Sequence, residues 1–516
     1  MKRLGPLRLR NRTVSLAFDI HSWLGILGCL ALFVCCFSGS LALFEQELVA
    51  WERPATRVDS DAEGLSVDQL LEVARQHLGA EKDMFVILPT PHSGGMQVRA
   101  FGDGKVEKVF LDPTSGAVVE AEHETAFEFL THLHTDLHLP RPFGRYLVGF
   151  LGIFLLMSLI TGVMTHTKVI KDLFLLRWRP RRLRLTFSDL HKQLGVWGLL
   201  FGFVMASTGA VLGLLGLFAP VMVLSAFGGD VDKATEAFSG PRFEATGSRA
   251  EMLSVDSMID DLEGRIPGTE VSSFFLRHWE DEAAEIALNL DQAPHRKLVA
   301  GETHRLSLVD GSTLHMSRFT ERGAGSRLFG AMQPVHYALF GGLAAKLLYF
   351  LLGVALSLGI ATGAMIWLER RRPAAAEQRE RRDRTFWLGR IHLGVSLGLV
   401  LSSALALAAG RIAPPFVEAT FWTAWLAIFV GAFFVPSSLV ALRAGGFLTA
   451  AVLVAVASYD LLASPVLPLA AKNVDIALLT LAGLVAAASA LIPKRARDSR
   501  NVDSQSQPAE ALPEPT

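Results

Sequence analysis

Four histidines recur at matching positions in the two halves of the chain, and imidazoles arranged in this way can ligate a metal. His21 and His191 each open the pattern His-x-x-Leu-Gly ahead of an apolar run, whereas His134 and His336 each precede a second kind of apolar run. Symmetry pairs His21 with His191 at one membrane face and His134 with His336 at the other. Two neutral imidazoles on facing helices, with no cysteine between them, suit bis-imidazole ligation of a b-type haem. For any single histidine, an interfacial position or a helix cap is the alternative.

A glycine follows each of these histidines at a nearly constant spacing inside the apolar run. The spacing is 18 residues in the first kind of run and 28 or 27 residues in the second. The four pairs are His21 and Gly39, His191 and Gly209, His134 and Gly162, and His336 and Gly363. We expect these glycines, with Ser40, to admit either a flat macrocycle or a closely packed helix. Since a span of about 20 residues rises roughly 30 Å, one haem at each face would form a path for electrons across the membrane.

Other residues compete for a place in the same sites. His138 would share a helix face with His134, and His166 closes the second apolar run, although Trp367 occupies its matching position. His392 opens His-Leu-Gly, which is similar to the His191 motif but lacks its spacing. The repeat-equivalent Arg145 and Lys346 could pair with haem propionates, and interfacial anchoring is the alternative for both.

The composition predicts an integral membrane protein. Of 516 residues 51% are hydrophobic, and the mean hydropathy is +0.36. The net charge of −1 favours no role with nucleic acid. All three cysteines fall inside the first apolar run, outside any Cys-x-x-Cys-His context for covalent haem. The basic N-terminus leads into that run without a clear cleavage site, which predicts a retained span.

Eight apolar runs are long enough to cross a bilayer. They cover residues 22–44, 144–166, 193–224, 345–368, 388–410, 419–441, 446–464 and 474–492. Basic residues flank the short loops, and an even number of spans places all of these loops in the cytoplasm together with both termini. The polar residues after Ser499 predict a disordered tail.

Two long stretches between spans resemble each other. Leu65-Ser-Val-Asp and Leu253-Ser-Val-Asp each predict a serine-capped helix, and alternating segments after them predict antiparallel strands. The fold class expected is therefore a mainly α membrane protein with about eight transmembrane helices, a duplicated four-helix haem-binding bundle and two small α+β modules. The expected division is 1–45, 46–130 (first module), 131–224, 225–330 (second module), 331–370, 371–387 (basic loop), 388–493 (the last four spans) and 494–516 (tail).

Residues 15–370 resemble the PepSY-associated transmembrane helix family. The resemblance rests on His21-Ser-Trp-Leu-Gly, Asp189-Leu-His-Lys-Gln-Leu-Gly, Leu133-His-Thr-Asp-Leu and Leu348-Tyr-Phe-Leu-Leu-Gly. It implies a bacterial inner-membrane haem protein that reduces ferric siderophores and carries PepSY-like modules in the periplasm. The four spans after Arg384 lie outside this resemblance.

The function expected is an inner-membrane oxidoreductase with two b-type haems, His21, His134, His191 and His336 being the axial ligands. Electrons would come from a quinol or a cytoplasmic donor and reduce an Fe(III)-siderophore in the periplasm. The chain lacks a Gly-x-Gly-x-x-Gly fingerprint, which disfavours direct oxidation of a nicotinamide cofactor. The alternatives are a siderophore or iron transporter without redox activity, and a regulator whose modules bind an envelope peptidase.

Overall fold

The structure is a computed structural model, and most of its described residues lie in helices. It describes residues 11–54, 57, 64–79, 81–89, 95–102, 104–120, 123–165, 183–241, 243–292, 302–317, 323–371, 384–463 and 469–492. Seven helices in this part of the chain are long and apolar enough to cross a membrane. They are α1 (Asn11–Ala42), α5 (Phe143–Thr165), α8 (Leu199–Phe227), α12 (Gly342–Arg370), α13 (Arg384–Ile412), α15 (Ser438–Ala463) and α16 (Leu469–Leu491). The chain is thus a multi-pass membrane protein.

The span predicted at 419–441 is shorter than expected. Helix α14 (Val417–Gly431) has 15 residues, a rise of about 22 Å against the roughly 30 Å of a hydrocarbon core. The apolar run continues to residue 435, but Pro436 follows, and proline can neither donate a backbone hydrogen bond nor favour helix in the residue before it. Seven helices therefore meet the length of a span where eight were predicted.

The span predicted at 193–224 is built from two helices. Helix α7 (Leu183–Trp197) ends at Gly198, and α8 begins directly after it. The matching glycine of the first half, Gly28, lies within the unbroken α1. The two halves therefore share their histidine and glycine spacing but not the course of this helix.

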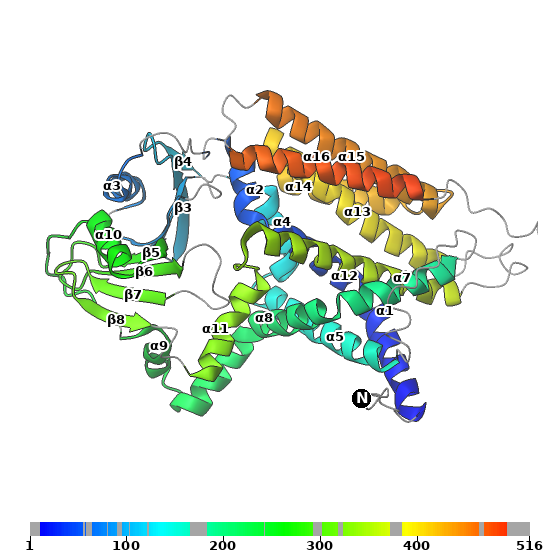
Figure 1. Ribbon diagram of the computed structural model, residues 1–516, viewed down its shortest axis with the longest axis horizontal. Helices are drawn as coiled ribbons and strands as arrows, with labels where there is room; N and C mark the ends of the chain where they lie inside the picture. The colour runs from blue at the N-terminus through cyan, green and yellow to red at the C-terminus, as the bar shows by residue number, and fades with distance from the viewer. Residues whose placement is uncertain are drawn as a thin grey trace, which may run out of the picture.

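The first half of the bundle has a small apolar core. Leu32 of α1, Leu155 of α5, Ala206 of α8 and Leu356 of α12 are buried together. Two short helices, α4 (Ala126–Asp136) and α11 (Ala324–His336), lead into α5 and α12. Helices α13 to α16 lie along one side of this bundle, with the 3-10 turn Pro414–Phe416 before α14 (Figure 1).

A single antiparallel sheet lies at one end of the helices (Figure 1), called here the sheet end. Its order is β4-β3-β2-β1-β5-β6-β7-β8. The strands are β1 (Asp83–Ile87), β2 (Met96–Gly102), β3 (Lys105–Leu111), β4 (Val118–Glu120), β5 (Thr269–Arg277), β6 (Glu285–Gln292), β7 (Glu302–Ser307) and β8 (Thr313–Ser317).

Each expected α+β module contributes four strands, and β1 joins them by pairing with β5 from Met84 opposite Leu276 to Ile87 opposite Ser273. Helices α3 (Val67–Leu78) and α10 (Val255–Arg265) pack on the sheet through one continuous apolar core. The sequence predicted the helices and strands of each half but not their union in one sheet. Two further helices, α2 (Glu45–Glu52) and α9 (Val231–Ser239), connect the sheet region to the spans.

Candidate functional site: two histidine pairs at opposite ends of the bundle

The four repeat-equivalent histidines meet in two pairs, each with one member from each half. The rings of His134 and His336 have centroids 6.1 Å apart and planes inclined by 23°. The rings of His21 and His191 have centroids 6.0 Å apart and planes inclined by 61°. All four side chains are partly buried. The pairing predicted from the repeat is therefore the pairing that the structure has.

The two pairs lie far apart along the bundle. His134 and His336 are carried by α4 and α11 at the sheet end, whereas His21 and His191 lie on α1 and α7 toward the other end, called here the far end (Figure 1). Gly39, 18 residues after His21 in the same helix, lies against His134, and 18 helical residues rise about 27 Å. Each pair thus occupies its own end of the bundle.

Each imidazole rests on a glycine of a neighbouring helix. A Cβ atom added at these glycines would lie 2.6 Å from the ring Cε1 at Gly39, 3.0 Å at Gly209, 3.2 Å at Gly162 and 2.9 Å at Gly363. The rings that they meet are those of His134, His336, His21 and His191, in that order. The repeated glycines therefore receive the imidazoles themselves. Each glycine receives the other histidine of its own half of the chain, and not the histidine from which its sequence spacing was counted.

Hydrogen bonds define which ring nitrogen of the far-end pair is free. His21 Nδ1 lies 2.9 Å from the carbonyl oxygen of Ser158, and His191 Nδ1 lies 2.7 Å from that of Gly359. Because a carbonyl oxygen can only accept, Nδ1 must carry the proton in both rings. Nε2 then keeps its lone pair, which is the state of a metal-ligating imidazole held by a carbonyl behind it.

The sheet-end pair is held in a related but unequal way. His134 Nδ1 lies 2.8 Å from the carbonyl oxygen of Cys35 and 3.5 Å from its sulfur. His336 Nδ1 lies 2.8 Å from the hydroxyl oxygen of Thr208. That hydroxyl also lies 2.7 Å from the carbonyl oxygen of Val204, to which it donates. Its oxygen is thus left to accept from Nδ1, so Nε2 is free in this ring as well.

The ring separations fit a bis-imidazole metal centre. Two imidazoles on opposite sides of one metal ion have centroids about 6.2 Å apart, since each metal–nitrogen bond is about 2.0 Å and the nitrogen lies about 1.1 Å from its ring centroid. Within the described ranges, no three His, Cys, Asp or Glu side chains gather into a metal-binding cluster. Each pair therefore offers two imidazoles at a separation that would suit one metal ion between them.

The competing histidines differ in their surroundings. His138 stacks on Phe129 with ring centroids 4.1 Å apart, and its Nε2 donates to the Phe129 carbonyl oxygen at 2.9 Å. His392 is buried in α13, and its Nδ1 has no hydrogen-bond partner among the described residues. His166 lies outside the described residues. Neither His138 nor His392 is a member of the two pairs described above.

The two basic residues proposed as propionate partners also differ from each other. Lys346 Nζ donates to Glu47 Oε1 at 2.5 Å, so α12 is tied to α2 by an ion pair. Arg145 is exposed near the start of α5. Only Arg145 thus presents an exposed charge, and the acidic partner of Lys346 was not predicted from the sequence.

Helix α4, which carries His134, is anchored at its N-terminus by two carboxyl groups that the sequence analysis missed. Buried Glu52 accepts from the backbone N–H of Ala126 at 2.7 Å, and burial raises its pKa to about 8. Thr125 and Glu128 form a capping box at the same turn. The signal for the capping box, Thr-x-x-Glu before an apolar run, is present in the sequence.

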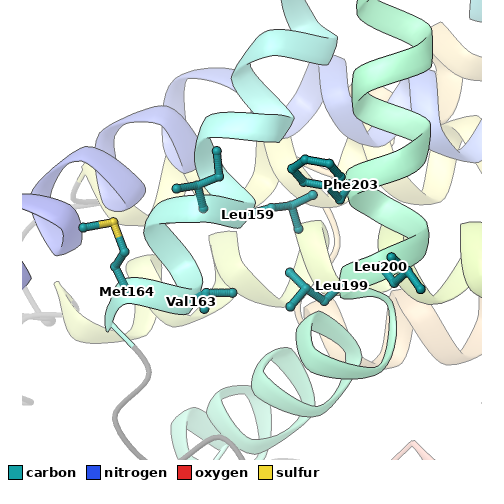
Figure 2. A pocket seen from close by; sticks show the side chains of 7 residues that line it. Leu159, Val163, Met164, Leu199, Leu200 and Phe203 are labelled. Atoms are coloured by element: carbon teal, nitrogen blue, oxygen red, sulfur yellow. The ribbon is translucent and has the colours of Figure 1, made fainter. Parts of the chain in front are cut away.

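A shallow apolar groove runs between α5 and α8 (Figure 2). Its lining residues are Leu159, Ile160, Val163, Met164, Leu199, Leu200 and Phe203. On α5 these residues directly follow Ser158 and Gly162, which contact His21. The lining offers no polar side chain that could orient a polar ligand, so the groove fits an acyl or isoprenoid chain better than a headgroup.

Comparison with known proteins gives a family and one curated relative. A family model described as "PepSY-associated TM region" matches residues 18–370. The chain is also 32% identical over 332 residues to "Uncharacterized protein PA4219" of Pseudomonas aeruginosa, which covers 60% of this chain and 80% of that protein. The matched region contains all four paired histidines and the sheet, and it ends before α13.

Proposed function

The chain belongs to the PepSY-associated TM region family, and we propose that it is an inner-membrane di-haem b oxidoreductase that reduces Fe(III)-siderophores. The observation that carries this proposal is that His21 lies beside His191 and His134 lies beside His336. Both pairs join the two halves of the chain, both leave Nε2 free on each ring, and they lie at opposite ends of the bundle.

The chain's own residues would do three things for such a cofactor. His21 with His191, and His134 with His336, would supply the axial nitrogens. The acceptors at Nδ1 orient each ring and raise the basicity of Nε2. The glycines let the rings sit close to the helices. A haem in each pair would supply one-electron transfer, and the exposed Arg145 could pair with a propionate.

The direction of transfer in this proposal follows the basic loops. They favour a cytoplasmic far end and a periplasmic sheet end. Oxidation of one quinol, or of an equivalent cytoplasmic donor, releases two electrons, which reduce two ferric ions one at a time; a quinol also releases two protons. Hard oxygen ligands hold Fe(II) less strongly than Fe(III), so each electron loosens one iron from its siderophore.

A reduced-minus-oxidised optical spectrum of the purified full chain, with haem counted per chain, tests the proposal. Two b-type haems are expected. His134→Ala or His336→Ala should remove one of them, and His21→Ala or His191→Ala the other, while His392→Ala should keep both. The reduced protein should be reoxidised by a ferric siderophore.

Two results would replace this function with another. A colourless protein that still supports iron uptake would point to a transporter without redox activity. A chain lacking all four histidines that keeps its cellular function would point to a regulator acting through the sheet region.

A further inference from the structure

A hydroxyl precedes each of the four glycines that receive the imidazoles. The residues are Ser38, Thr161, Thr208 and Thr362. Each donates to the carbonyl oxygen four residues earlier in its helix, at 2.7 Å in the first three and 2.8 Å in the last. This local bond fixes the hydroxyl hydrogen and leaves the oxygen lone pairs directed away from the helix axis.

Three of the histidines form their Nδ1 hydrogen bond with a backbone carbonyl, and one forms it with this hydroxyl. His21, His134 and His191 meet a carbonyl oxygen four residues before their glycine. The matching carbonyl for His336 is that of Met205, but His336 meets the hydroxyl of Thr208 at 2.8 Å instead. The Thr208 oxygen lies 3.4 Å from the Met205 carbonyl oxygen. A hydroxyl thus takes the place that a carbonyl has in the other three cases.

We propose that Thr208 is a positioning residue that makes the sheet-end centre easier to reduce than the far-end centre. This inference rests on the function proposed above. The two halves of the chain are alike in their histidines and glycines, and this hydroxyl would make the reduction potentials of the two centres differ.

The physical reason lies in the strength of the acceptor at Nδ1. A stronger acceptor pushes more electron density onto Nε2 and so favours the oxidised metal. The far-end pair has two carbonyl acceptors, whereas the sheet-end pair has one carbonyl and one hydroxyl. A neutral hydroxyl oxygen is a weaker acceptor than the oxygen of a backbone amide carbonyl, whose resonance places more negative charge on it. An electron that enters at the far end therefore moves to the higher potential at the sheet end.

The test compares three variants of the full chain. Thr208→Val keeps the volume and removes the acceptor, and Thr208→Ser restores a hydroxyl. Ser38→Ala is the matched control, because Ser38 makes the same local bond while His134 meets the Cys35 carbonyl. Haem content and the two midpoint potentials are measured by optical titration, and the imidazole tautomers of the haem-free protein by nitrogen NMR.

In Thr208→Val we expect the haem content to be kept. The reduced-to-oxidised ratio of one haem should rise by about tenfold at a fixed potential, equivalent to 59 mV for one electron. Thr208→Ser and Ser38→Ala should resemble the wild type. A wild-type sheet-end potential that is not above the far-end potential, an unchanged sheet-end potential in Thr208→Val, or an equal shift in Ser38→Ala, would overturn the inference.

The haem-free spectra separate the two proposals. If the purified wild-type protein contains no haem, the proposed function is wrong. A His336 ring that is protonated at Nδ1 in the wild type and loses this preference only in Thr208→Val would still support the positioning role of Thr208. A His336 tautomer that is the same in all variants would count against it.

Discussion

Asp68 and Asp256 each cap the helix of the other half of the sheet. The Asp68 carboxylate accepts from the Val255 N–H at 2.8 Å and the Ser254 hydroxyl at 2.6 Å. The Asp256 carboxylate accepts from the N–H groups of Val67 and Asp68 at 2.9 and 2.8 Å. The repeated Ser-Val-Asp therefore does more than cap its own helix, because it also joins α3 to α10 across the β1–β5 junction.

Replacing either aspartate by alanine should loosen both helices. Each carboxylate satisfies two donors at a helix N-terminus, where loss of a cap costs about 1–2 kcal/mol. Hydrogen exchange should become faster in α3 and α10 together in Asp68→Ala and in Asp256→Ala. Asp261→Ala, which removes only an exposed pair with Arg265, is the control. Faster exchange confined to the helix of the mutated residue would argue against a shared cap.

The glycines under the imidazoles should not tolerate a methyl group. In Gly39→Ala the new Cβ would lie 2.6 Å from the His134 ring, so the ring must move and the sheet-end haem should be lost or spectrally altered. Gly25→Ala is the matched control in the same helix, with no atom within 4 Å of the new Cβ. It should gain up to about 1 kcal/mol from helix propensity. Equal haem spectra in both variants would contradict the seating role of Gly39.

The N-terminus of α4 should weaken in acid. Burial alone would raise the pKa of Glu128, but the charges of Lys108 and Arg53 lower it from 4.5 to about 2. A carboxyl group with a depressed folded-state pKa contributes stability above its unfolded pKa and loses it as the pH falls through the folded value. The thermal midpoint should therefore drop between pH 4.5 and 2, by an amount equivalent to roughly 3 kcal/mol at most. Glu128→Gln should lack this drop, and the same pH profile in both proteins would refute its assignment to Glu128.

A buried ion cluster should hold the last helices to the rest of the molecule. Asp460 of α15 is fully buried and accepts from Arg57 at 2.9 and 3.0 Å and from Arg411 at 2.5 Å. Asp460→Asn would remove the negative charge that the buried Arg57 and Arg411 share, and removing one partner of a buried ion pair costs about 3–5 kcal/mol. The thermal midpoint should fall.

Asp475→Asn provides the comparison for that variant. In the wild type Trp51 Nε1 donates to Asp475 Oδ1 at 3.0 Å, and the amide oxygen of an asparagine can still accept this hydrogen bond. Its thermal midpoint should fall less than that of Asp460→Asn. Equal loss in the two variants would show that burial of any carboxyl group, and not the charge of Asp460, is what matters.

The sequence by itself determined the features that depend on local order. Apolar runs of sufficient length predicted most of the spans, period-two alternation predicted the strands, and serine before an apolar helix predicted the caps of α3 and α10. The repeat carried one long-range prediction as well. Two similar halves that pack against each other bring equivalent residues together, so the repeat predicts that His21 meets His191 and that His134 meets His336.

Only the tertiary structure decided what depends on contacts between distant segments. The pairing of β1 with β5, the exchange of Asp68 and Asp256, and the ion pair of Arg57 with Asp460 join residues more than 180 positions apart. The length of α14 depended on where packing and Pro436 end the helix. The acceptor of His336, which is the Thr208 hydroxyl and not a backbone carbonyl, depended on how α11 packs against α8. Spacing along the chain shows which residues recur in the two halves. Which atom accepts a hydrogen bond from a given side chain depends on how the helices pack.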